Sequence, residues 1–94
     1  AEEPDLQAAI AWCEYQLSPK APADMARTQG TLALVIEQAP RIARAHYFLG
    51  FVLVDQGRPT AAIQSFRTAH ELDPRLIDAE RQARAIELRT GGPS

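Results

Sequence analysis

Proline and glycine residues divide this chain of 94 residues into segments of helical length. Proline cannot donate a helix hydrogen bond, and it disfavours helical geometry in the residue before it. Between the breaks the residues are mostly strong helix formers, and no segment shows the period of two that is typical of a half-buried strand. The sequence therefore predicts an all-α fold without a sheet, and the expected helices cover residues 4–17, 22–39, 42–56, 59–72 and 75–89.

Several of these helix ends carry a local signal. Pro4, Pro22 and Pro59 would each lie in a first turn, where the missing N–H is one that the helix does not use. Gly57 follows the third expected helix, where a left-handed residue commonly ends a helix. Gly30 lies inside the second expected helix, where glycine costs about 1 kcal/mol relative to alanine. We therefore expect a neighbouring helix to approach closely at Gly30.

Composition and charge narrow the class of protein. Hydrophobic residues make up 46% of the chain and charged residues 23%, as in ordinary globular proteins. The formal net charge of -2 argues against generic binding to a phosphate backbone. The apolar run 47–54 is far shorter than the roughly 20 residues that cross a bilayer, and the acidic amino terminus is unlike a secretory signal. Because Cys13 has no partner for an internal disulfide, we expect a cytoplasmic protein, with the periplasm as the alternative if a leader was removed.

The sequence predicts no enzyme, no cofactor and no metal site. Its nucleophilic and basic side chains are Cys13, Ser18, His46, Ser65 and His70, and none of them belongs to a phosphate loop, a nucleophile elbow or a zinc-protease motif. Cys13 has apolar neighbours in the sequence, so we expect it to be a buried, inert filler.

Two helical stripes in the middle of the chain are complementary. The first stripe consists of side chains at positions i, i+3, i+4 and i+7 of the helix expected over 42–56, and the second lies on the helix expected over 59–72. Their members are His46, Leu49, Gly50 and Leu53, and then Ala62, Phe66 and Ala69. Small residues at Gly50 and Ala62 let the backbones approach, and Phe66 fills the remaining space. The segment is therefore predicted to form an antiparallel helical hairpin.

These positions, together with Pro74, resemble a tetratricopeptide repeat, and His46 stands where that family usually has tryptophan. The resemblance implies an α-solenoid of antiparallel helical hairpins, in a single domain over 1–90. Its parts would be a degenerate repeat over about 4–40, a full repeat over 43–76 and a capping helix over 75–89, with a disordered tail at 91–94. When the stripe of Ala62, Phe66 and Ala69 is moved upstream by one repeat length of about 34 residues, it falls on Thr28, Leu32 and Val35. Downstream, the contact stripe of the last helix holds Ala79, Ala83 and Ile86.

A third apolar stripe on the helix over 42–56 holds Tyr47, Phe51 and Val54. In tetratricopeptide arrays this face lines a concave groove that binds peptides or partner helices. The groove that the resemblance implies is formed by Arg44, Tyr47, Phe48, Phe51, Val54, Asp55, Asp78, Arg81, Gln82 and Ala85. The alternative is that the stripe is core, covered because the array is short. Phe51 occupies the place of the asparagine in carboxylate-clamp members of the family, which favours an apolar or amphipathic ligand.

The sequence therefore predicts a non-enzymatic protein-protein interaction module that binds a peptide or a partner helix. The first alternative is a homo-oligomerisation or scaffolding module of a larger protein, and the second is a helical-repeat nucleic-acid binder. Charge is uneven along the chain, because residues 1–40 hold six acids against Lys20 and Arg27, whereas residues 41–94 hold six acids against eight arginines. Such asymmetry can attract a charged partner or favour head-to-tail stacking of copies, although uneven charge more often forms only a solvated surface.

Overall fold

The structure is a computed structural model that describes residues 3–90, so the predicted tail at 91–94 lies outside the described residues. The described part contains no strand and consists of five α-helices joined by short connections. They are α1 (Pro4–Leu17), α2 (Pro22–Gln38), α3 (Ala43–Asp55), α4 (Pro59–Leu72) and α5 (Ile77–Arg89). The all-α prediction is confirmed, and each helix end lies within two residues of its predicted position.

The largest difference is at the start of the last helix, which begins at Ile77 rather than at residue 75. Asp73 holds the preceding turn, because its Oδ1 accepts hydrogen bonds from the backbone N–H and the side-chain Nε of Arg75, both at 3.1 Å. The backbone N–H of Leu76 also donates to the Asp73 carbonyl. These bonds keep residues 73–76 in a turn and delay the first helical residue.

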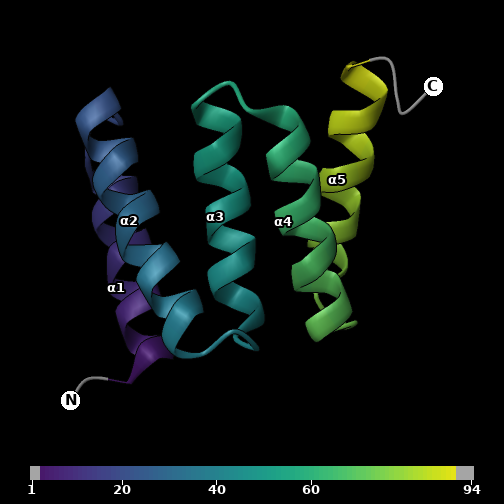
Figure 1. Ribbon diagram of the computed structural model, residues 1–94. Helices are drawn as coiled ribbons and strands as arrows, with labels where there is room; N and C mark the ends of the chain where they lie inside the picture. The colour runs from purple at the N-terminus through teal and green to yellow at the C-terminus, as the bar shows by residue number, and fades with distance from the viewer. Residues whose placement is uncertain (1–2, 91–94) are drawn as a thin grey trace.

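The helices stand in a row that runs from the α1–α2 hairpin through α3 to the α4–α5 pair (Figure 1). The described molecule measures 44 × 30 × 19 Å, and its smallest dimension is about two helix diameters. Figure 1 shows α1 passing behind α2 and α5 behind α4. The row therefore has two ends, one formed by α1 and α2 and the other by α5.

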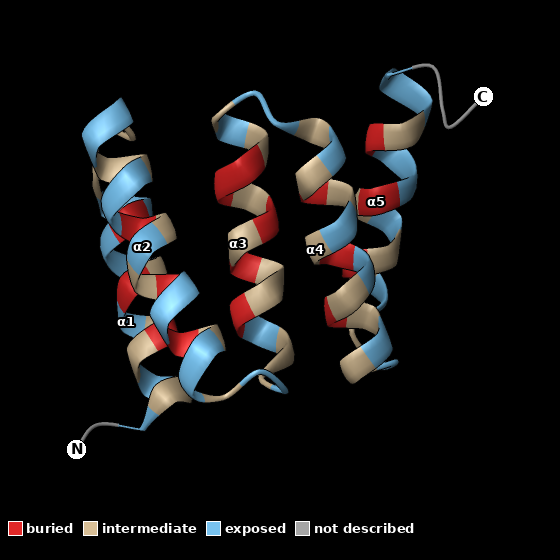
Figure 2. Cartoon of the chain, in the orientation of Figure 1, coloured by how far each residue is buried: buried red, intermediate tan, exposed pale blue. Residues whose placement is uncertain are grey.

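Two hydrophobic cores meet at α3. The first core joins α1, α2 and α3 through Ala8, Tyr15, Leu32, Val35, Ala45, Phe48 and Val52. The second joins α3, α4 and α5 through Leu53, Ala62, Phe66, Ala69, Ala79, Ala83 and Ile86. Figure 2 shows buried residues on successive turns of α3. The predicted contact stripes of α2, α4 and α5 are all buried, with Thr28, Leu32 and Val35 on α2.

The α3–α4 hairpin depends on two glycines with different roles. A Cβ atom at Gly50 would lie 2.6 Å from Cε1 of Phe66, so only glycine fits against that ring. Gly57 has a φ of 75°, in the left-handed region that glycine adopts without strain. The N–H groups of Gly57 and Arg58 donate to the carbonyls of Val54 and Leu53, which is the pattern of a Schellman cap. The small-residue contact and the left-handed stop are both confirmed.

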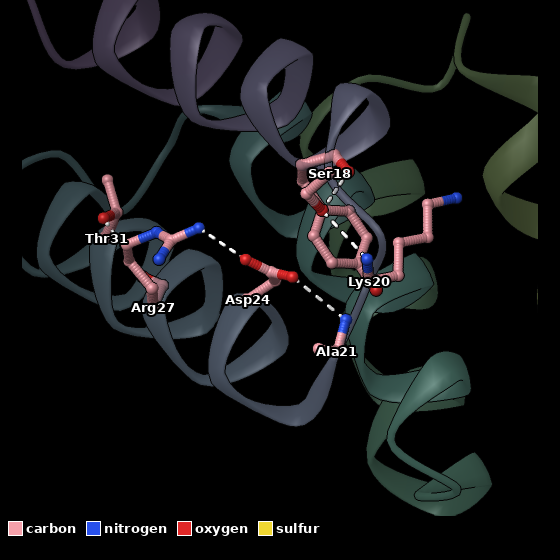
Figure 3. A network of polar contacts seen from close by, with 7 residues as sticks. Ser18, Lys20, Ala21, Asp24, Arg27 and Thr31 are labelled. Atoms are coloured by element: carbon pink, nitrogen blue, oxygen red, sulfur yellow. Dashed lines mark hydrogen bonds and ion pairs between the residues drawn. The ribbon is translucent and has the colours of Figure 1, made fainter.

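The α1–α2 connection is stabilised by a chain of local hydrogen bonds (Figure 3). The hydroxyl of Ser18 donates to the Tyr15 carbonyl at 2.7 Å and accepts the N–H of Lys20 at 3.1 Å. Asp24 then accepts the N–H of Ala21 at 3.0 Å, which satisfies one of the free donors at the start of α2. This connection fixes the hairpin although Lys20 adopts a left-handed φ of 57°.

Two expectations about single residues are wrong. No neighbouring atom lies within 4 Å of the position that a Cβ atom would take at Gly30, so no helix approaches there. Cys13 is exposed rather than buried. The reason is that α1 buries Ala8, Ala11 and Tyr15, and this stripe places Cys13 on the opposite side of the helix.

Candidate partner-binding face

All six aromatic residues of the chain form one connected cluster of rings. The Trp12 ring stacks on the Phe48 ring, with centroids 4.9 Å apart and planes inclined by 4°. Phe51 lies 5.0 Å from both Tyr47 and Phe66 in edge-to-face contacts. Such geometries suit aromatic rings because the positive edge of one ring meets the negative face of another. The cluster connects α1, α3 and α4.

Trp12 is the residue of this face that the sequence analysis missed. Its centroid lies 5.5 Å from that of Phe51, so a side chain of α1 adjoins the predicted stripe of α3. The available signal was its i, i+3 spacing from Tyr15, which places two aromatic rings on one side of α1. That spacing does not say which neighbour α1 faces, because the 18–21 connection shifts α1 against the repeat register.

Hydrogen bonds tie the three odd-numbered helices together beside the aromatic rings. Tyr15 of α1 donates its hydroxyl to Asp55 of α3 at 2.6 Å, and Tyr47 of α3 donates to Asp78 of α5. Burial, followed by the hydrogen bond and the charge of Asp78, raises the pKa of Tyr47 to about 12. Burial and Asp55 raise the pKa of Tyr15 further still. Both phenols therefore remain neutral donors at physiological pH.

An ion pair adds a further link between α1 and α3. The guanidinium of Arg44 lies 2.5 Å from the carboxylate of Asp5, and both side chains are about half exposed. An exposed pair of this kind contributes about 1 kcal/mol or less to stability. Together with the tyrosine bonds, this ion pair links α1 to α3 and α3 to α5, and we call the surface around these links the α1–α3–α5 face.

The predicted groove residues differ in their exposure. Phe48 is 9% exposed and is covered by the stacked Trp12 ring, so it offers little surface. Tyr47, Phe51, Val54, Asp78 and Gln82 are partly buried, whereas Arg44, Asp55, Arg81 and Ala85 are exposed. His46 points elsewhere, and its ring Nε2 donates a hydrogen bond of 3.0 Å to the Pro40 carbonyl in the loop before α3.

A separate cavity, which the sequence analysis did not predict, lies between α1 and α2. It encloses about 310 Å³ and its walls include Ile10, Ala11, Glu14, Arg27, Thr31 and Leu34. Arg27 is held by Asp24 at 2.7 Å. Phe51 and the other predicted groove residues are not among its lining residues.

The described helices include none with the length and apolar character needed to cross a membrane. Within residues 3–90 no three or more His, Cys, Asp or Glu side chains gather in a way that would hold a metal ion.

The central hairpin is similar to a known family. Residues 43–76 match the tetratricopeptide repeat family model. The matched residues are α3, α4 and the turn that precedes α5, so this part of the chain is similar to a tetratricopeptide repeat. Repeats of this family act as protein-protein interaction modules, typically without enzymatic activity. Comparison with curated proteins and with solved structures gave no match to this chain.

Proposed function

We propose that this chain binds a partner protein by holding an apolar or amphipathic helix against the α1–α3–α5 face. The observation that carries the proposal is the position of Phe51. Phe51 is partly exposed and its ring contacts the rings of Trp12 and Tyr47, so an apolar side chain of a ligand would pack against a group of aromatic rings. Aromatic anchors of this kind dominate the energy of many protein interfaces.

The charges around these rings favour a particular ligand. Asp55 and Asp78 each accept a tyrosine hydroxyl, and Arg44 is paired with Asp5. Arg81 is exposed and makes no ion pair within residues 3–90. The ligand that fits is therefore a helix with an apolar stripe for Phe51 and an acidic side chain for Arg81.

A library of displayed peptides, selected on the immobilised chain, provides the test. Each selected peptide is then titrated by fluorescence anisotropy against the wild type and against Phe51→Ala and Ala85→Glu. Ala85 is exposed on α5, so its substitution changes the face without opening a core. We expect both variants to weaken binding at least about tenfold, which corresponds to about 1.4 kcal/mol.

The matched control is Ala33→Glu, which makes the same substitution at an exposed position of α2. It should bind the selected peptides as the wild type does. Circular dichroism of every variant separates a lost contact from a lost fold. Peptides that bind Phe51→Ala and Ala85→Glu with wild-type affinity would show that the ligand lies elsewhere.

A further inference from the structure

The large apolar side chains that are most exposed lie at the two ends of the row of helices. In the described residues they are Leu6, Ile10, Leu17, Leu34, Ile77 and Leu88. The first four belong to α1 and α2, and the last two belong to α5, whereas α3 and α4 contribute none. Figure 1 places α1 and α2 at one end of the row and α5 at the other. Within residues 3–90 each end therefore presents exposed apolar side chains.

Charges of opposite sign lie among the exposed apolar side chains of the two ends. At the α1–α2 end, Glu14 lines the cavity and makes no ion pair within residues 3–90, whereas Arg27 is neutralised by Asp24. At the α5 end, Arg81 is exposed and makes no ion pair within residues 3–90, and Arg84 is exposed and paired with Glu80 at 3.4 Å. We call the surface around Leu6, Ile10, Glu14, Leu17 and Leu34 the acidic end, and the surface around Ile77, Arg81, Arg84 and Leu88 the basic end.

The apolar side chains at the two ends also match in spacing. Leu6 and Leu17 are eleven residues apart on α1, and Ile77 and Leu88 are eleven residues apart on α5. Eleven residues make about three helical turns, so each pair lies on one side of its helix about 16 Å apart. Glu14 lies between the two leucines, and Arg81 and Arg84 lie between Ile77 and Leu88. A parallel docking therefore brings Glu14 opposite Ala85 and next to Arg84, whereas an antiparallel docking brings it next to Arg81 but opposite Glu80.

From these observations we propose that the basic end of one copy docks on the acidic end of the next copy. The outer side of α5 would lie along the groove between α1 and α2, so that Ile77 and Leu88 contact the leucines of the neighbouring copy. Such a contact is heterologous, because the two surfaces differ, and it extends into an open chain of copies unless the rotation closes a ring. It uses neither Phe51 nor Tyr47, and Arg81 is the one residue of the basic end that it shares with the proposed ligand face.

Sedimentation of the full chain over a concentration series tests the proposal. We expect the average mass of the wild type to rise from about 10 µM to about 1 mM and to pass beyond that of a dimer. Leu17→Glu and Leu88→Glu each block one end at side chains that are 88% and 78% exposed, so both variants should fold. Each variant alone should remain a monomer over the whole range. Ala33→Glu, the control, should associate as the wild type does.

Mixing the two blocked variants gives the decisive result. Leu17→Glu retains the basic end and Leu88→Glu retains the acidic end, so their equimolar mixture should form a dimer and nothing larger. Raising the salt from about 50 mM to about 500 mM should weaken this dimer, because the contact between Glu14 and the arginines is screened. A wild type that stays monomeric throughout overturns the proposal. So does a mixture that fails to associate, or a Leu88→Glu variant that dimerises alone through a symmetric α1–α2 contact.

Discussion

Replacing Gly50 and Gly30 by alanine, one at a time, tests the packing of the repeat against a matched control. Both glycines lie inside helices, so alanine should stabilise each helix by about 1 kcal/mol through propensity alone. At Gly30 nothing lies within 4 Å of the added methyl group. We expect Gly30→Ala to be more stable than the wild type by about 1 kcal/mol, with a melting temperature about 4 to 8 °C higher.

At Gly50 the same methyl group would lie 2.6, 2.7 and 2.8 Å from three atoms of the Phe66 ring. That ring is fully buried and meets the rings of Phe51 and Tyr47 edge to face, so it has little room to move. Overpacking of this kind costs about 1 to 3 kcal/mol, and three close contacts place the cost near the upper limit. Gly50→Ala should therefore be less stable than the wild type by about 2 kcal/mol once helix propensity is included.

Urea unfolding followed by far-UV circular dichroism measures both variants. The two midpoints should move in opposite directions, and the unfolding free energies should differ by about 3 kcal/mol. A double variant of Gly50→Ala with Phe66→Leu should show a favourable coupling energy, because leucine leaves space for the methyl group. If Gly50→Ala proves as stable as Gly30→Ala, the Phe66 ring does not pack against Gly50 and the account of the hairpin fails.

Three further predictions concern the Gly57 cap, the Tyr47 hydroxyl and the Trp12 ring. Gly57→Ala should lower the unfolding free energy by about 1 to 2 kcal/mol, measured by urea unfolding, because its φ of 75° is strained for a residue with a Cβ atom. The folded chain holds the Tyr47 proton more tightly than the unfolded chain, since the pKa of Tyr47 is about 12 and that of a free tyrosine is about 10. The stability that this shift contributes is present below about pH 10 and is lost as the pH rises towards about 12. Urea midpoints measured across this pH range should therefore fall less steeply for Tyr47→Phe than for the wild type. Trp12→Ala removes the ring that stacks on Phe48 and should cost about 3 kcal/mol in thermal unfolding, whereas a loss below about 1 kcal/mol would contradict the stacking.

The features that the sequence predicted well are set by local chemistry or by a fixed period. Pro22 and Pro59 begin helices because ring geometry acts on the residue itself, and Gly57 ends one for the same kind of reason. The contact stripes, such as Leu32 on α2 and Phe66 on α4, follow from helical periodicity and from the repeat length. These signals need no knowledge of how distant helices are placed.

The errors concern residues whose surroundings depend on distant helices. Gly30 is small, but the sequence does not say whether a neighbour approaches it, and none does. Cys13 has apolar neighbours in the sequence, yet the angular position of Tyr15 and Ala11 turns it towards solvent. The contact of Trp12 with Phe51 depends on the shift of α1, which the 18–21 connection sets. The groove itself stays a prediction, because exposure alone does not show that a ligand lies there.

The stacking of helices in one row explains why the surfaces of this chain differ. Tyr47 and Leu49 of α3 pack against both cores, so α3 keeps its exposed surface mainly on the side of the proposed ligand face. The helices at the ends have a core on one side alone, and a terminal helix needs a polar outer side if it is to remain uncovered in water. The helix α5 meets this need in part, through Arg81 and Arg84 beside Leu88, whereas α1 presents Leu6, Ile10 and Leu17. This difference between the two ends gives the row a direction, which a symmetric pair of caps would not.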